Sequence, residues 1–77
     1  QLFDVRTEAE FVQGAVPGAR NVPVQYLKAK AGNLDSNKPV IVYCRTGGRS
    51  AKAQRLLEGI GFRQVHNAGG IDSYLSD

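Results

Sequence analysis

Short apolar runs alternate along the chain with stretches in which apolar residues recur at helical spacing. The runs cover residues 2–5, 19–24, 40–43 and 62–67. The run at 40–43 is apolar throughout, which is typical of a strand covered on both faces, as in a parallel sheet. The pattern predicts four strands with helical segments between them.

Two short helices are predicted between the first three strands. Thr7 and Glu10 have the spacing of a capping box, so the first helix is expected to begin at Glu8 and to stop at Gly14. A second brief helix is predicted over residues 25–31, because a Gly-Asn pair follows it. Strand and helix therefore alternate from the start of the chain.

A longer helix is predicted after the third strand, and it has one apolar face. Its apolar residues have the i, i+3, i+4, i+7 spacing of a buried face; they are Ala53, Leu56, Leu57 and Ile60. A last helical turn is expected through Ile71, Tyr74 and Leu75. Such alternation with short loops implies right-handed crossovers. We therefore expect an α/β fold with a small parallel sheet of four to five strands flanked by helices.

Polar and reactive residues gather at one edge of this expected sheet. In open parallel sheets, ligands bind beyond the carboxyl ends of the strands. Arg6 follows the first predicted strand, Cys44 ends the third, and Gly69 and Gly70 follow the fourth. A site at this edge would be assembled from several loops.

Cys44 lies between a buried strand and the start of a helix. There, backbone N–H groups and the positive end of the helix dipole stabilise a thiolate, whose free pKa is ~8.5. A lone cysteine at a strand end is often only a small core residue. The pair Gly47 and Gly48, flanked by Arg45 and Arg49, instead favours a nucleophile or an anion-binding site.

Composition narrows the possible functions. The chain has 77 residues, one cysteine, one histidine and a net charge of +3. An internal disulfide and a His/Cys zinc cluster are excluded, no cofactor is expected, and no apolar run is long enough to cross a membrane. The basic residues are scattered except around Cys44, which favours a small anionic substrate or an acidic partner over nucleic acid.

Four segments, in order, resemble a single-domain rhodanese of the thiosulfate sulfurtransferase family. They are Leu2–Arg6 with the helix after it, Val16–Pro23, Cys44–Ser50 and Gly61–Gly70. The resemblance implies a parallel α/β sheet and a cysteine that takes sulfane sulfur as a persulfide and passes it to an acceptor. Thiosulfate is then the expected donor, and cyanide or a protein thiol such as thioredoxin the expected acceptor.

The chain departs from this family in two respects. Rhodanese domains usually carry a strand and a helix ahead of the Asp-Val-Arg segment, so residues 1–77 are predicted to form one rhodanese-like domain without them. The strand near residues 64–66 would then be an exposed edge. Ala15 stands where the family often has histidine, so no catalytic histidine is expected. The cytoplasm is the expected compartment, or the periplasm if a signal peptide was removed.

The predicted site lies in one loop. Cys44 is the nucleophile, and the substrate-binding residues are Arg45, Thr46, Gly47, Gly48, Arg49 and Ser50. Backbone N–H groups of the loop are expected to cradle the persulfide. Arg45 and Arg49 would hold the sulfonate of the donor, although Arg49 could equally form an ion pair with Glu10. Thr46 and Ser50 would either donate to the thiolate or cap the helix, and capping is favoured for Ser50.

Two other activities are weighed against sulfur transfer. Cysteine phosphatases and arsenate reductases also place a thiolate before a helix, but they carry five residues between cysteine and arginine. Four separate Cys44 from Arg49, and the tighter ring suits a single sulfur better than a tetrahedral oxyanion. A rhodanese-like module that relays sulfur or binds a partner without turnover is the other alternative. Asp4 and Arg6 are expected to form a structural ion pair.

Overall fold

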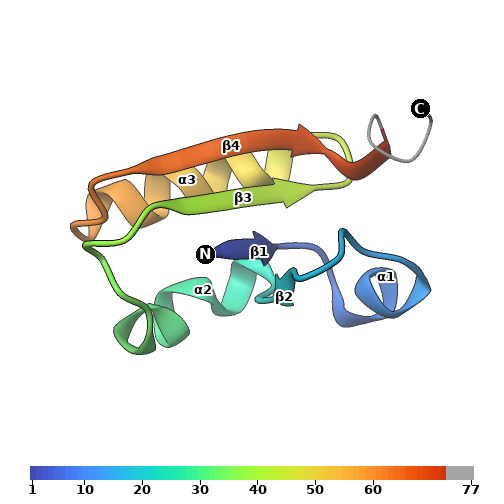
Figure 1. The fold of residues 1–77 in the computed structure, drawn as a ribbon, viewed down its shortest axis with the longest axis horizontal. Coiled ribbons are helices and arrows are strands. Elements are labelled where there is room, and N and C mark those ends of the chain that lie inside the picture. The colour runs from blue at the N-terminus through green and yellow to red at the C-terminus, as the bar shows by residue number, and fades with distance from the viewer. Residues whose placement is uncertain (73–77) are drawn as a thin grey trace.

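The computed structural model describes residues 1–72 as a four-stranded parallel sheet with helices packed on it (Figure 1). The strands are β1 (Leu2–Asp4), β2 (Arg20–Asn21), β3 (Val40–Cys44) and β4 (Val65–Gly70), and their order in the sheet is β2-β1-β3-β4. The helices are α1 (Glu8–Gln13), α2 (Val24–Lys30) and α3 (Gly48–Gly59), with a 3-10 turn at Ala31–Asn33. The predicted parallel α/β fold is confirmed.

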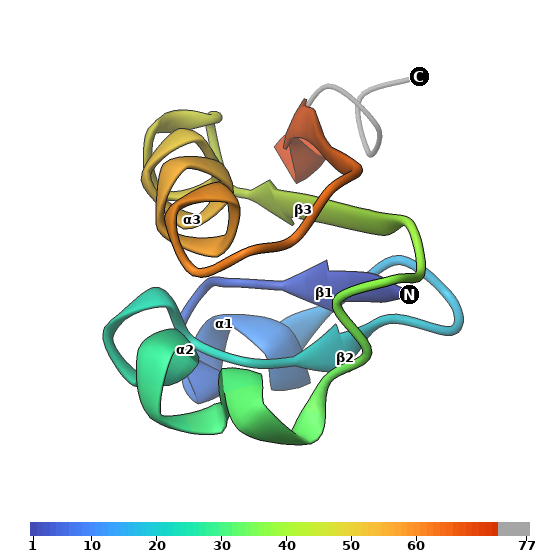
Figure 2. The same cartoon turned by 90° about the vertical axis from the view of Figure 1, so that its left-hand side faces the viewer.

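The helices take two different positions around the sheet. α3 packs on β3 and β4, and α2 packs against α3 (Figure 2). Short α1 lies beyond the carboxyl ends of β1 and β2 (Figure 1). The capping box predicted for α1 is present, since the Thr7 side chain accepts from the Glu10 N–H and the Glu10 carboxylate accepts from the Thr7 N–H. This cap starts α1 at Glu8, as predicted.

One continuous core lies between the sheet and α2 and α3. Its members are apolar and buried: Phe3, Val5, Val22, Leu27, Ala31, Val40, Val42, Cys44, Ala53, Leu57, Phe62 and Val65. Two sequence expectations are wrong here. Ile41 is 41% exposed, because side chains alternate along a strand and its face of β3 is uncovered there. Ile60 is 45% exposed, because it follows the last residue of α3 and does not lie on its buried face.

Strand boundaries also differ from the pattern in the sequence. β2 is shorter than predicted, although the N–H groups of Val22 and Val24 continue the pairing by donating to the Asp4 and Val5 carbonyls. β4 starts later and runs through Gly70, into residues expected to form a loop. The pairing of β4 with β3 shifts register between Val42 and Cys44, so that Val42 lies opposite Asn67 and Cys44 lies opposite Gly70. Of the last predicted turn, Tyr74 and Leu75 lie outside the described residues.

β4 is an outer strand of the sheet, as expected for the strand near residues 64–66. Among residues 1–72 it pairs only with β3. The longest helix of this part of the chain, α3, has 12 residues. None of the helices in the described range has the length and apolar character that a bilayer-spanning segment requires.

Candidate active site

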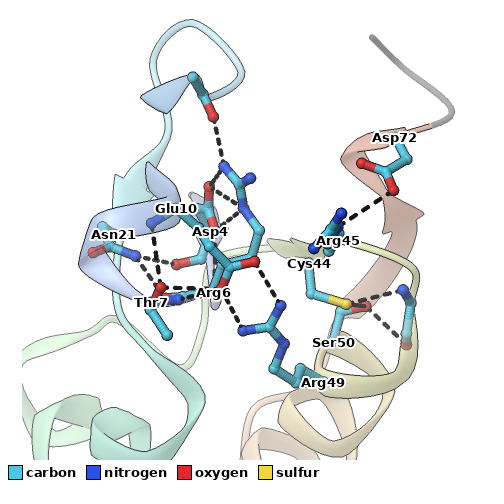
Figure 3. Close-up of polar contacts among 12 residues, drawn as sticks. Asp4, Arg6, Thr7, Glu10, Asn21, Cys44, Arg45, Arg49, Ser50 and Asp72 are labelled. Carbon is cyan, nitrogen blue, oxygen red and sulfur yellow. Dashed lines mark hydrogen bonds and ion pairs between the residues drawn. The ribbon is translucent and has the colours of Figure 1, made fainter. Parts of the chain in front are cut away.

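The carboxyl ends of β1, β3 and β4 meet at one edge of the sheet, as expected for parallel strands (Figure 3). This edge brings together Asp4 at the end of β1, Arg6 just after it, Cys44 from β3 and the Gly69-Gly70 pair of β4. α1 closes one side of the edge and the start of α3 another. The predicted assembly of the site from several loops is therefore what the structure shows.

The Cys44 thiol sits inside the turn that joins β3 to α3. Its Sγ accepts a hydrogen bond from the Gly47 N–H at 2.9 Å and lies 3.4 Å from the Ser50 Oγ. Only 1% of the residue is exposed. Cys44 is thus buried and held by groups that favour its thiolate form.

Opposing effects set the acidity of this thiol. Burial on its own raises the pKa of Cys44, since it disfavours the charged form. Hydrogen bonds from the Ser50 side chain and from the backbone N–H groups of Ser50, Gly47 and Thr46 outweigh burial, and the pKa of Cys44 falls below its ordinary value. The sequence-based expectation of a stabilised thiolate agrees with this geometry.

Ser50 does not cap α3, so that expectation is wrong. The N-cap is Gly47, which has no side chain and adopts a left-handed φ of 108°. The fully buried Ser50 hydroxyl lies within α3, 3.0 Å from the Gly47 carbonyl and 3.5 Å from the Gly69 carbonyl, and donates toward them. It therefore links the cysteine, the loop and the end of β4.

The loop and β4 approach each other so closely that only glycine fits at position 70. A Cβ at Gly70 would collide with the Arg45 carbonyl oxygen and would lie 2.8 Å from the Thr46 Cα. The close approach places the end of β4 against the loop between β3 and α3. The sequence signal for it is the Gly69-Gly70 pair after a strand pattern.

Arg49 is engaged by Glu10 of α1, one of the two roles that the sequence left open. Two parallel hydrogen bonds of 2.7 and 2.9 Å join the guanidinium to the carboxylate. The bond from Arg49 is the main cause that lowers the pKa of Glu10 from 4.5 to about 2. Glu10 therefore ties α1 to the first turn of α3.

Arg45 is held only weakly. Its side chain is 65% exposed and its Nε lies 3.6 Å from a carboxylate oxygen of Asp72, which is itself 58% exposed. Exposed pairs of this kind contribute little to stability. Arg45 is therefore the arginine of the loop that is able to turn toward a ligand. Thr46 is exposed beside it and contributes its backbone N–H to the thiolate.

Asp4 and Arg6 form the structural ion pair that the sequence led us to expect. The Arg6 Nε and Nη2 donate to the Asp4 carboxylate over 2.6 to 3.0 Å, and Nη2 also donates to the Gly14 carbonyl at 2.7 Å. The guanidinium lies 5.8 Å from the centre of the Tyr43 ring. This buried pair fixes the path of the chain from β1 to the end of α1.

Several residues of the edge were not found from the sequence. The Tyr43 hydroxyl accepts from the Val16 N–H at 3.1 Å, and the Asn21 amide donates to the carbonyls of Asp4 and Arg6. A pocket of about 260 Å³ beside the loop is lined by Arg6, Glu10, Gln13, Gly14, Arg45, Ile71 and Asp72. For these residues, the one available signal in the sequence was that Tyr43 is next to Cys44. The contacts that Tyr43 and Asn21 make join segments that are distant in the sequence.

Comparison with known proteins identifies the family. The sequence pattern of the family described as Rhodanese-like domain matches residues 1–77. The chain is 37% identical over 71 residues to "Thiosulfate sulfurtransferase PspE" of Escherichia coli K12, covering 90% of this chain and 68% of that protein. It is 39% identical over 70 residues to YqhL of Bacillus subtilis, covering 91% of this chain and 56% of YqhL.

A solved structure shows the same fold. The human single-domain sulfurtransferase TSTD1 superposes with a TM-score of 0.91 at 27% identity, covering all of this chain and 81% of TSTD1. The chain thus spans little more than half of YqhL and about two thirds of PspE. These similarities in sequence and in fold show that the chain belongs to the rhodanese-like sulfurtransferase family.

Proposed function

We propose that this chain transfers sulfane sulfur from thiosulfate, or a similar donor, to a thiophilic acceptor through a persulfide on Cys44. The Cys44 thiolate attacks the outer sulfur of thiosulfate, the S–S bond of the donor breaks, and sulfite leaves with the bonding electron pair. The acceptor then attacks the outer sulfur of the persulfide, and Cys44 returns as thiolate. Cyanide and a protein thiol such as thioredoxin are the acceptors we propose.

The observation that carries this proposal is the set of donors around Cys44. A hydroxyl and backbone N–H groups converge on one sulfur atom, which supports both the attacking thiolate and its regeneration as a leaving group. The left-handed Gly47 gives the turn its tight shape. This arrangement of donors suits a single buried sulfur atom.

We assign the binding of the donor sulfonate to Arg45 ahead of Arg49. Arg49 is committed to Glu10 in two short hydrogen bonds, whereas Arg45 has only a long, exposed contact with Asp72. A guanidinium matches the oxygens of a sulfonate as it matches a carboxylate or phosphate. The cytoplasmic location and the span of the domain over residues 1–77 stay predictions.

Intact mass spectrometry of the reduced protein before and after thiosulfate tests the proposal. We expect a gain of one sulfur atom that cyanide removes and that Cys44→Ala lacks. A Ser36→Ala variant is the matched control, since Ser36 lies before β3 and away from the loop.

The same experiment separates the alternatives. A persulfide that forms once but is not turned over with thiosulfate and cyanide indicates a sulfur-relay or binding module. Folded, reduced protein that gains no sulfur rejects the sulfurtransferase, and a phosphatase assay would then test the remaining cysteine chemistry.

A further inference from the structure

Two neighbouring hollows adjoin β2, at the opposite edge of the sheet from β4. One, of about 290 Å³, contains Arg20 in its wall and is called the Arg20 hollow. The other, of about 420 Å³, contains Tyr26 and is called the Tyr26 hollow. Asn21 and Lys30 line both hollows, so the two are adjacent. No residue of the Cys44–Ser50 loop is among their described lining residues, and the sulfur chemistry leaves both without a role.

The Arg20 hollow is positively charged. Arg20 and Lys30 are exposed, and among residues 1–72 neither takes part in an ion pair. Asn33 adds an amide that donates hydrogen bonds, and the described lining residues include no carboxylate. Two cations and an amide around one hollow suit a compact anion with several acceptor oxygens, such as a phosphate group.

The wall that the two hollows share is held in place by β1. The Asn21 side-chain amide donates to the carbonyls of Asp4 and Arg6, each at 3.0 Å. Arg20 and Asn21 form β2 itself, and Lys30 is the last residue of α2. The groups that would contact a ligand therefore project from regular elements, which favours a preformed site.

The Tyr26 hollow offers an aromatic ring beside these charges. Tyr26 is 54% exposed, and it precedes Lys30 by four residues in α2, so their Cβ atoms lie about 6 Å apart on one helix face. A flat ring of a ligand can stack on an exposed tyrosine. Gln25 and Glu8 also line this hollow and supply hydrogen-bonding groups for ring substituents or a sugar hydroxyl.

We propose that the two hollows together bind a mononucleotide, with its phosphate between Arg20 and Lys30 and its base against the Tyr26 ring. In a mononucleotide one ribose separates the phosphate from the base, which suits a cation and an aromatic ring one helical turn apart. The Glu8 carboxylate belongs to the Tyr26 hollow and is not among the described residues around the phosphate. Binding is noncovalent and does not depend on sulfur transfer by Cys44.

Amide NMR titrations of the whole chain at low ionic strength test this inference. The ligands are adenosine 5′-monophosphate, ribose 5-phosphate and adenosine, which carry both recognised groups, the phosphate alone, or the base alone. We expect the monophosphate to bind most tightly and to shift the amides of Asn21, Tyr26 and Lys30. The loop amides of Thr46 and Gly47 should not respond.

Two variants should separate the two halves of the site. Arg20→Gln should weaken binding of the monophosphate and of ribose 5-phosphate about tenfold, as expected for the loss of a charge-assisted hydrogen bond. Tyr26→Ala should weaken binding of the monophosphate at least about fivefold and leave ribose 5-phosphate unchanged. Lys38→Gln is the matched control, because it removes one exposed positive charge outside both hollows. The NMR spectrum of each variant shows directly whether it is folded.

Three results would overturn the inference. Arg20→Gln and Lys38→Gln having the same effect would mean that only the general positive charge attracts the ligand. Equal affinities for the monophosphate and ribose 5-phosphate would mean that the base makes no contact. Shifts centred on Gly47 would place the anion at the Cys44 loop. The proposed sulfur transfer is unaffected by any of these results, because Arg20→Gln should still form the Cys44 persulfide with thiosulfate.

Discussion

The environment of the Cys44 sulfur consists of a small number of short-range contacts. The Ser50 hydroxyl and the Gly47 N–H lie within hydrogen-bonding distance of its sulfur, while burial opposes its charge. The Ser50 hydroxyl has a single proton and also donates toward the Gly47 carbonyl. An ionised Cys44 sulfur can only accept, so a hydrogen bond between the two groups then requires this proton to point to the sulfur.

Ser50→Ala should raise the pKa of Cys44 and slow its reaction near neutral pH several-fold, since the first of the favourable hydrogen bonds is lost. The pH dependence of alkylation by iodoacetamide measures this pKa directly. In wild type we expect a midpoint below that of a free thiol, ~8.5, with the rate rising as pH increases through it. An unchanged midpoint in Ser50→Ala, judged beside Ser36→Ala, would contradict this role.

At the level of elements, the site depends on links between segments that are distant in the sequence. Glu10 and Arg49 connect α1 to α3, and Gly70 lets β4 lie against the loop after β3. The Glu10–Arg49 link lies outside the core. Gly70 pairs with Cys44 in the sheet, so a side chain at position 70 would disturb the contact between β3 and β4.

Glu10→Gln should destabilise the fold by about 1 kcal/mol near neutral pH, because a partly exposed but bidentate ion pair is lost. The pKa of Glu10 is about 2 in the folded chain and ~4.3 in an unfolded chain. The stabilisation is therefore present above ~pH 4.3 and is lost as the pH falls toward 2. Urea denaturation of both proteins at several pH values should show their difference shrinking over this interval, and a difference independent of pH would count against the pair.

Gly70→Ala should cost about 1–3 kcal/mol, because the new Cβ would collide with the backbone of Arg45 and Thr46. It should also slow persulfide formation, since the loop must shift. Gly59→Ala is the matched control: a Cβ there meets nothing within 4 Å, and reduced freedom of the unfolded chain should stabilise by up to about 1 kcal/mol. Equal stability of the two variants in urea would show that the close approach at Gly70 is unimportant.

The whole molecule is small, and its stability rests on one core. A chain of 77 residues buries a smaller fraction of its surface than larger domains do. Each fully buried side chain is thus a large share of the free energy of unfolding. The exposed Ile41 adds apolar surface without adding to that core, whereas the outer strand β4 contributes Val65 to it.

Leu57→Ala should destabilise by about 2–5 kcal/mol, because Leu57 is fully buried in the core and leaves a cavity. Ile60→Ala, only a few residues further on, should cost less than about 1 kcal/mol, since that side chain is 45% exposed. Urea denaturation of the two variants measures the contrast. Similar losses would mean that α3 is not buried along the face containing Leu57.

Local sequence patterns were enough to predict the order of the elements and to propose Cys44–Ser50 as the site. The alternation of apolar runs with helical spacing predicted the parallel α/β sheet, and the Thr7–Glu10 box predicted the start of α1. Cys44 before a glycine pair predicted a stabilised thiolate at a helix start. Each of these features depends on residues that are close together in the sequence, so each can be predicted from a short segment of the chain.

The partners of the loop side chains became known only from the three-dimensional structure. Arg49 pairs with Glu10, 39 residues away, whereas Arg45 makes only a long contact with Asp72. Ser50, which was expected to cap the helix, contacts the thiol of Cys44. The structure also shows that Ile41 is exposed and that Arg6, Arg45 and Asp72, from distant segments, line one pocket. These outcomes depend on which distant groups meet in space, and competition between such partners is settled by packing and not by local pattern.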